Sequence, residues 1–207
     1  MKKELLVATT NPKKGREMLQ ILGAYCPELT LLTLSDIEPM PMVEETGETF
    51  YENARLKAVA AAKHARRVAI ADDGGLVIDA LDGAPGVHSH RFLGADTSFD
   101  EKMDKILEIM RHVPDERRTC RFQCVVVVAT PDGQEFVSEG SCEGLVAHEK
   151  RGHYGFGYDP IFYLPQLGRH MAELTPDEKH RISHRGVALR GVIPILRSLF
   201  QLDSREC

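Results

Sequence analysis

Residues 122–129 limit the possible folds more than any other segment of the chain. Their sequence, FQCVVVVA, holds four consecutive valines. β-branched residues favour strands, and a strand whose apolar run is almost continuous is typically buried on both faces. We therefore expect this segment to be a central strand of a sheet.

Strand-like and helix-like segments alternate along the 207 residues, with no repeat and no low-complexity linker. This alternation predicts an α/β fold with one long central sheet. The expected strands are residues 5–9, 68–71, 76–78, 122–129 and 135–148, the last as one or two strands, and the expected helices start at residues 12, 49, 100, 175 and 183.

Several residues mark where helices begin or break. Asn11 followed by Pro12 is typical of a helix start, and Thr49 with Glu52 fits a capping box. Gly191 and Pro194 lie inside the apolar pattern of the last helix. We expect a kink or break there. The run Asp72-Asp73-Gly74-Gly75 predicts a turn or bulge between two strands.

The bulk composition excludes some classes of protein. A chain of 207 residues buries roughly 70% of its unfolded surface, enough for one domain with a sizeable core. Its net charge of -5 argues against broad nucleic-acid or membrane-surface binding, which both rely on lysine and arginine. No segment is long enough to span a bilayer. Five cysteines without metal-site spacing indicate reduced thiols and a cytoplasmic protein.

The loop after the first strand combines a helix start with two lysines. Lys13 and Lys14 lie at the positive end of the helix dipole, which is unfavourable unless an anion binds there. First-turn amides, the polar side chains of residues 9–11 and the two ammonium groups could hold a phosphate. An exposed lysine pair on a capped helix is the alternative, because short motifs often mislead.

Two acidic clusters supply the opposite charge. Glu44 and Glu45 precede the second helix, and Asp72 and Asp73 follow a buried strand. Mg2+ takes one or two protein carboxylates together with substrate phosphate oxygens, so these acids are candidate ligands. Asn53 and Lys57 lie four residues apart, hence on one helix face near the acid loop. Lys57 could contact phosphate or an attacking water, or it could be a surface salt-bridge partner.

The last third of the chain combines an aromatic turn with a basic run. Residues 155–160 read GFGYDP, a tight turn that can hold a flat ring near the backbone. Residues 179–185 read KHRISHR and contain no acid, which predicts an anion site. Together the two motifs suggest a nucleotide. The alternative is a surface turn beside a solvated helix end.

Five motifs in order resemble the inosine triphosphate pyrophosphatase family, also called XTP/dITP diphosphatases. They are ATTNPKKGRE, EETGETFYENARLKA, ADDGGLVIDALDGAPGVHSHRF, GFGYDPIF and AELTPDEKHRISHRG, and the resemblance runs from residue 5 to about residue 190. It implies a long mixed sheet flanked by helices, in a single domain of two lobes with a central cleft over residues 1–207, usually as a homodimer. It also implies Mg2+-dependent hydrolysis of ITP, dITP and XTP to the monophosphate and pyrophosphate.

The resemblance assigns roles residue by residue. It implies a metal site at Glu44 and Asp73, with Asp73 as the proton acceptor. Because successive strand residues face opposite sides, we do not expect Asp72 and Asp73 to share one role. Gly74 stands where the family usually has serine. The triphosphate would contact Thr9, Thr10, Asn11, Pro12, Lys13 and Lys14, and the base and remaining phosphate contacts would involve Gly74, Phe156, Gly157, Tyr158, Asp159, Lys179, His184 and Arg185.

Three alternatives to this function stay open. The first is a nucleotide-sensing protein without turnover, and the second is a pyrophosphatase for other modified nucleotides. The third is an interaction protein whose basic run docks an acidic partner.

Overall fold

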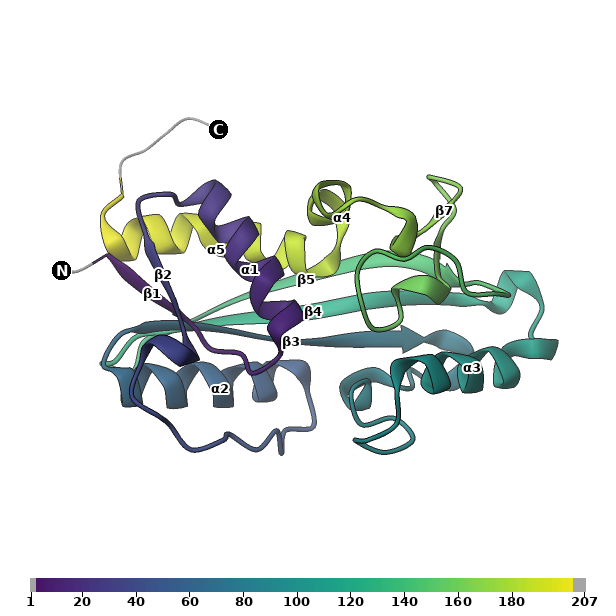
Figure 1. The fold of residues 1–207 in the computed structure, drawn as a ribbon, viewed down its shortest axis with the longest axis horizontal. Helices are drawn as coiled ribbons and strands as arrows, with labels where there is room; N and C mark the ends of the chain where they lie inside the picture. The colour runs from purple at the N-terminus through teal and green to yellow at the C-terminus, as the bar shows by residue number, and fades with distance from the viewer. Residues whose placement is uncertain (1–2, 203–207) are drawn as a thin grey trace. The chain divides into compact units, whose positions relative to one another are not determined.

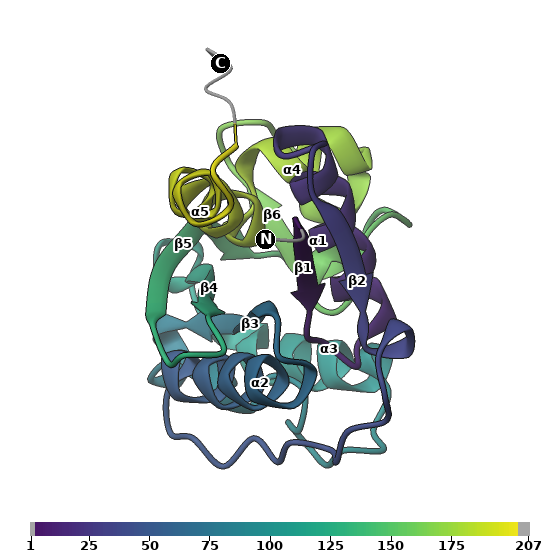
Figure 2. The ribbon, with the colours of Figure 1, turned by 90° about the vertical axis from the view of Figure 1, so that its left-hand side faces the viewer.

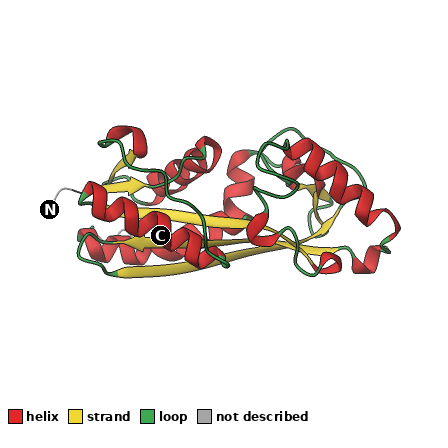
Figure 3. Cartoon of the chain, turned by 90° about the horizontal axis from the view of Figure 1, so that it is seen from below, coloured by secondary structure: helices red, strands yellow, loops and turns green. Residues whose placement is uncertain are grey.

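The computed structural model describes residues 3–202. One seven-stranded sheet has the order β2-β1-β3-β4-β5-β6-β7. The β1 strand pairs in parallel with β2 and β3, whereas β6 pairs antiparallel with β5 and β7. The strands are β1 Glu4–Val7, β2 Thr30–Thr33, β3 Val68–Ile78, β4 Thr119–Ala129, β5 Glu135–Val146, β6 Phe162–Leu164 and β7 Arg169–His170. The α-helices are α1 Pro12–Tyr25, α2 Phe50–Ala65, α3 Phe99–Ile109, α4 Pro176–Ile182 and α5 His184–Phe200. Figure 3 distinguishes them by type, with helices red and strands yellow.

This arrangement confirms the predicted α/β fold with a mixed sheet flanked by helices. The chain divides into two compact units, and each is described by itself. Unit 1 comprises residues 1–73, 124–140 and 185–207, and unit 2 comprises residues 74–123 and 141–184. The single domain of two lobes stays a prediction. No helix within residues 3–202 has the length and apolar character to cross a membrane.

Unit 1 has three layers because its strands are apolar on both faces. Leu5 and Val7 pack with residues of α1 and α5, whereas Leu6 and Ala8 pack with the buried alanines of α2. The apolar run in β4 alternates in the same way. Val126 and Val128 pack in the layer of α1 and α5, and the alternate residues pack in the layer of α2, namely Val125, Val127 and Ala129. Figures 1 and 2 show α1 and α5 on one side of these strands and α2 on the other. The prediction of a strand covered on both faces is confirmed.

Unit 2 has a separate core. Leu76 and Ile78 of β3 pack there with Phe122 of β4, with α3 and with the segment around Ile161. Figure 1 shows α3 and α4 on opposite sides of the strands of this unit. The elements of unit 2 therefore have their own apolar support.

The helix starts agree with their sequence signals. The side chain of Asn11 accepts hydrogen bonds from the amides of Lys13 and Lys14, with Pro12 at the first helical position. Thr49 and Glu52 form the predicted capping box of α2, and Thr175 caps α4. All three predictions are confirmed, since each cap depends only on residues within four positions in the chain.

Neither segment predicted to be interrupted is divided into two elements, whereas a bulge in β3 and a kink in α5 stay predictions. β3 is one continuous strand through Asp72, Asp73 and Gly74, with no break between two strands. The glycine that follows is needed for packing: a Cβ on Gly75 would lie 2.2 Å from Ser89 Oγ. α5 likewise continues unbroken through Pro194, and a Cβ on Gly191 would lie 2.1 Å from Ser138 Oγ. In each place, close packing explains a glycine that the sequence pattern attributed to a break.

The four cysteines within the described residues are free and buried. Burial raises the pKa of Cys124 to about 12 and that of Cys142 to about 11. These thiols stay protonated near neutral pH. Cys207 lies outside the described residues.

Candidate active site

The two aspartates of β3 face opposite sides of the sheet in unit 1. Ile70, two residues before Asp72, packs in the layer of α1 and α5, and Ala71, two residues before Asp73, packs against α2. Side chains alternate along a strand, so the aspartates continue these two rows. The prediction that they do not share one role agrees with this geometry.

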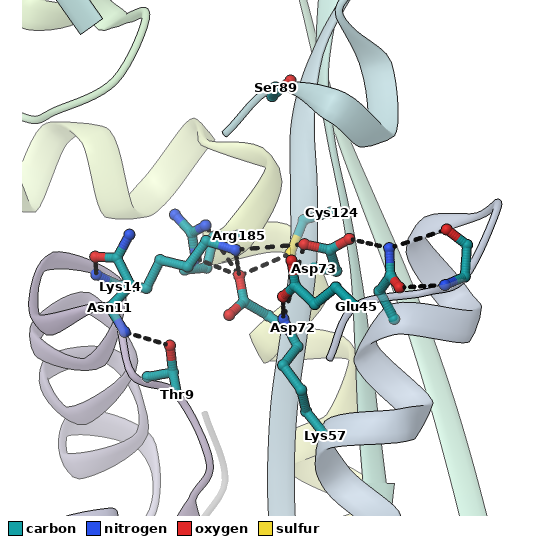
Figure 4. A network of polar contacts seen from close by, with 12 residues as sticks. Thr9, Asn11, Lys14, Glu45, Lys57, Asp72, Asp73, Ser89, Cys124 and Arg185 are labelled. Carbon is teal, nitrogen blue, oxygen red and sulfur yellow. Dashed lines mark hydrogen bonds and ion pairs between the residues drawn. The ribbon is translucent and has the colours of Figure 1, made fainter. Parts of the chain in front are cut away.

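Asp72 lies at the centre of a buried ion cluster. Its Oδ2 accepts a hydrogen bond from Arg185 Nε at 3.0 Å and lies 2.9 Å from Arg185 Nη2 and 3.5 Å from Lys14 Nζ. Arg185 Nη1 also donates to Glu17 Oε2 at 2.7 Å. Burial raises the pKa of Asp72, but Lys14 and Arg185 outweigh it and hold that pKa well below its usual value. Figure 4 shows Lys14 and Arg185 converging on this carboxylate.

Asp73 shares Lys14 with Asp72, but its other contacts come from α2. Its Oδ1 lies 3.6 Å from Lys14 Nζ and 3.8 Å from Lys57 Nζ, and its Oδ2 accepts a hydrogen bond from Asn53 Nδ2 at 3.3 Å. Burial raises the pKa of Asp73, partly offset by Lys14 and Lys57, while Glu45 raises it further. A raised pKa makes this carboxylate a stronger proton acceptor than an ordinary aspartate.

The acid loop before α2 contacts the same lysine through Glu45. Lys57 Nζ lies 2.6 Å from Glu45 Oε1, so this ammonium group is shared by Glu45 and Asp73. Burial lowers the pKa of Lys57, but Asp73, Asp72 and Glu45 raise it more, so Lys57 stays protonated. Glu44, the residue implied by the family resemblance, is exposed. The structure thus brings Glu45, rather than Glu44, to the Asp73 side of the sheet.

These carboxylates fit a hard divalent cation. Glu45 and Asp73 already share one cation, the Lys57 ammonium group, and Asp72 Oδ1 is buried with no hydrogen-bond partner among the described residues. Within residues 3–202, no group of three or more histidine, cysteine or acidic side chains could hold a metal ion. A metal here would therefore need further oxygen ligands from water or substrate phosphate, which is usual for Mg2+.

The loop at residues 9–14 differs from the predicted phosphate cradle in one respect. The amides of Lys13 and Lys14 already donate to Asn11 Oδ1, at 3.0 and 3.2 Å, because Asn11 caps the helix. Asn11 N donates to Thr9 Oγ1 at 3.2 Å. Thr10, Pro12 and Lys13 are exposed, and Lys14 turns towards the aspartates. An anion at this loop would meet side chains rather than the two capped amides.

In unit 2, the aromatic turn is built on a buried ion pair. Lys179 Nζ lies 2.6 Å from Asp159 Oδ2, with side-chain exposures of 4% and 3%. The same oxygen accepts a hydrogen bond from the amide of Phe156 at 2.8 Å, and the ammonium group lies 4.6 Å from the centre of the Phe156 ring. Asp159 and Lys179 therefore hold the turn and orient its aromatic ring.

The sequence suggested one anion site in the basic run from residue 179 to residue 185. In the structure, the buried cations of this run do not form one exposed site. Lys179 is neutralised by Asp159 in unit 2, and Arg185 is bound by acids in unit 1. His184 is buried, with its ring 4.8 Å from that of Phe122. Lys179 and Arg185, the two buried cations of this run, bind different carboxylates, since a buried charge without a partner would be costly.

The chain is similar to one known family over almost its whole length. The Ham1 family model matches residues 5–195. The chain belongs to the Ham1 family. It is 48% identical over 187 residues to a dITP/XTP pyrophosphatase of Geobacillus kaustophilus, covering 90% of this chain and 91% of that protein. A dITP/XTP pyrophosphatase of Yersinia pestis is 45% identical, with coverages of 94% and 98%. The Staphylococcus aureus Ham1 protein structure matches with a TM-score of 0.84 at 37% identity, covering 95% of this chain and 99% of that one.

The family resemblance predicted from the five motifs is therefore confirmed. Sequence reasoning nevertheless missed one member of the site in this Ham1 protein, Glu17. A signal was present: Glu17 lies on α1 three residues after Lys14 and four before Ile21, on the stripe that faces the core. An acid on such a stripe indicates a buried cation partner, here Arg185.

Gly155 of this Ham1 protein offers a test of the aromatic turn. Its φ is +72°, and a Cβ there would lie 2.1 Å from Asp159 Oδ2. We expect Gly155→Ala to lower the free energy of unfolding by roughly 2–5 kcal/mol, because left-handed strain adds to overpacking. Urea unfolding followed by circular dichroism measures the change. Gly168→Ala is the matched control, with a φ of +64° and no atom within 4 Å of the added carbon. Equal losses in the two variants would contradict the contact with Asp159.

Proposed function

We propose that this Ham1 protein is a nucleoside-triphosphate pyrophosphatase that hydrolyses ITP, dITP and XTP to the monophosphate and pyrophosphate. The observation that carries the proposal is the placement of Asp73, a carboxylate of raised pKa held within 4 Å of two lysines beside an acid loop. A proton acceptor flanked by cations suits hydrolysis of a phosphoanhydride bond. The names of the relatives support the choice of dITP and XTP.

In the proposed reaction, Asp73 orients a water and accepts its proton. The water oxygen forms a bond to the α-phosphorus, the bond from that phosphorus to the bridging oxygen breaks, and pyrophosphate leaves with the electron pair. Lys14 and Lys57 stabilise negative charge that develops on the phosphate oxygens. Lys13 and Thr10, which are exposed on the first loop, contact the outer phosphates.

We propose Mg2+ as the metal of this site, held by Asp73 with a glutamate of the acid loop. The resemblance favours Glu44, whereas the ion pair with Lys57 favours Glu45. When bound, Mg2+ would neutralise phosphate charge and make a bound water more acidic.

The base would bind in unit 2 at the aromatic turn. The Phe156 ring stacks on a purine, and Gly157, Tyr158 and Asp159 supply the surrounding backbone and polar groups, with Lys179 beside the ring. The roles of His184 and Arg185 in substrate binding rest on the family resemblance alone. A site that donates hydrogen bonds to the 6-oxo group leaves its donors unpaired opposite the adenine amino group, which rejects ATP. Poor accommodation of the 2-amino group would reject GTP. Gly74 lacks the hydroxyl usual in the family, which removes one contact to substrate.

The decisive assay separates this function from its alternatives. Purified protein with Mg2+ is incubated with ITP, dITP, XTP, ATP or GTP, and the monophosphate, diphosphate, pyrophosphate and phosphate produced are quantified. We expect monophosphate and pyrophosphate from the first three substrates and about 10,000-fold less from ATP, the discrimination that unpaired polar groups provide. Tight binding of ITP without turnover would instead indicate a nucleotide sensor. Turnover of other nucleotides alone would indicate a different modified substrate.

We also propose a homodimer in the cytoplasm. The family resemblance supports the dimer, and four buried free cysteines support a reducing compartment. Light scattering after size exclusion measures the mass, and a monomer at micromolar concentration would contradict the dimer.

A further inference from the structure

A buried asparagine of α2 connects the acid loop to Asp73. Asn53 has no exposed surface. We propose that Asn53 is a positioning residue that holds the Asp73 carboxylate and the acid loop at a set spacing. This inference rests on the proposed function, because it concerns the orientation of the proton acceptor.

The amide of Asn53 uses both of its ends. Its Oδ1 accepts a hydrogen bond from Gly47 N at 2.8 Å, while its Nδ2 donates to Gly47 O at 3.4 Å and to Asp73 Oδ2 at 3.3 Å. One acceptor and two donor hydrogens match these three partners. A carboxylate at position 53 would lack both donors, and an apolar side chain would lack all three bonds.

The contact between Asn53 and the acid loop requires glycine at position 47. A Cβ there would lie 2.6 Å from the Cβ of Glu52 and 2.8 Å from Asn53 Oδ1. Only glycine brings the loop backbone this close to the helix. The acid loop is therefore attached to α2 by its backbone, two residues after Glu45.

The attachment sets the geometry of the carboxylates. Since Asn53 binds Oδ2 of Asp73, the carboxylate is oriented with Oδ1 towards Lys14 and Lys57. Lys57 follows one helical turn after Asn53 and also binds Glu45 of the attached loop. A single side chain thus controls the orientation of the proton acceptor and the reach of the loop acid. Without it, the carboxylate can rotate and the loop can move away.

The test compares two substitutions of Asn53 with a control at the same helix end. Asn53→Asp keeps the shape and the acceptor of the amide, and Asn53→Ala removes the side chain. Thr49→Ala removes the hydrogen bond to Glu52 N that caps α2, but touches neither Gly47 nor Asp73. We expect both Asn53 variants to lower kcat for ITP by about 100-fold with KM within about threefold, since small misplacement of a reacting group costs this much. Thr49→Ala should lower the Tm while keeping kcat within about threefold.

A second readout does not depend on turnover. The Gly47 amide should exchange with solvent slowly by NMR in the wild type and Thr49→Ala, and at least 10-fold faster in Asn53→Ala. Wild-type kcat in Asn53→Asp, or a loss of kcat that follows Tm across all three variants, would overturn the inference. An inactive wild type would refute the proposed function instead. Unchanged Gly47 exchange in Asn53→Ala would still refute the attachment.

Discussion

Replacing Asp73 by asparagine is expected to lower turnover of ITP by about 100- to 10,000-fold, the usual contribution of a general base. The amide has almost the same shape but cannot accept the proton of the attacking water. The amide keeps one oxygen, which can accept a hydrogen bond from Asn53 or from a lysine, so the fold should persist. Steady-state kinetics with ITP, together with thermal unfolding, measure both effects.

Asp132→Asn serves as the control for that experiment. Asp132 is an exposed turn residue of unit 1, and its change should leave kcat within about twofold because it lies outside the site. Undiminished turnover in Asp73→Asn would remove Asp73 from the role of proton acceptor. An equal loss of folding and activity would show that the residue acts through stability alone.

Arg185→Ala is expected to lower the free energy of unfolding by about 3–5 kcal/mol, because it removes the guanidinium group that binds two buried carboxylates. Asp72 has no exposed surface and Glu17 is 8% exposed, and both bind the Arg185 guanidinium group. Urea unfolding at neutral pH measures the change. The resemblance assigns Arg185 to substrate contacts, but its geometry gives it a structural task that does not require substrate.

The comparison for Arg185 is an ion pair at the surface. Arg55 binds Glu135 through two hydrogen bonds on the surface of unit 1, and Arg55→Ala should cost far less stability because solvent screens exposed charges. Combining Arg185→Ala with Asp72→Asn and Glu17→Gln should recover part of the lost stability, because the buried negative charges disappear. A loss in Arg185→Ala no larger than that in Arg55→Ala would contradict the buried cluster.

Features that depend on nearby residues were predictable. The caps at Asn11, Thr49 and Thr175 form between residues within four positions of one another, so their motifs were sufficient. The opposite faces of Asp72 and Asp73 follow from strand geometry alone. The family was predictable as well, because five motifs in order are specific even where each alone is weak.

Ion partners could not be predicted from local patterns. Arg185 reaches Glu17, 168 positions away, and Asp72, 113 positions away, and nothing near Arg185 in the chain indicates either acid. The basic run suggested one anion site for the same reason: its charges were visible, but the buried carboxylates that neutralise them were not.

The apolar run of β4 was enough to predict that helices cover the sheet of unit 1 on both faces, since a strand that is apolar on both faces must be buried on both. The choice of Glu45 over Glu44 at Lys57, and the use of Asn53 to hold Asp73, were decided only when α2, the acid loop and β3 packed together. The sequence pattern does not distinguish Glu44 from Glu45. The packed structure does, because Glu45 is the one that binds Lys57.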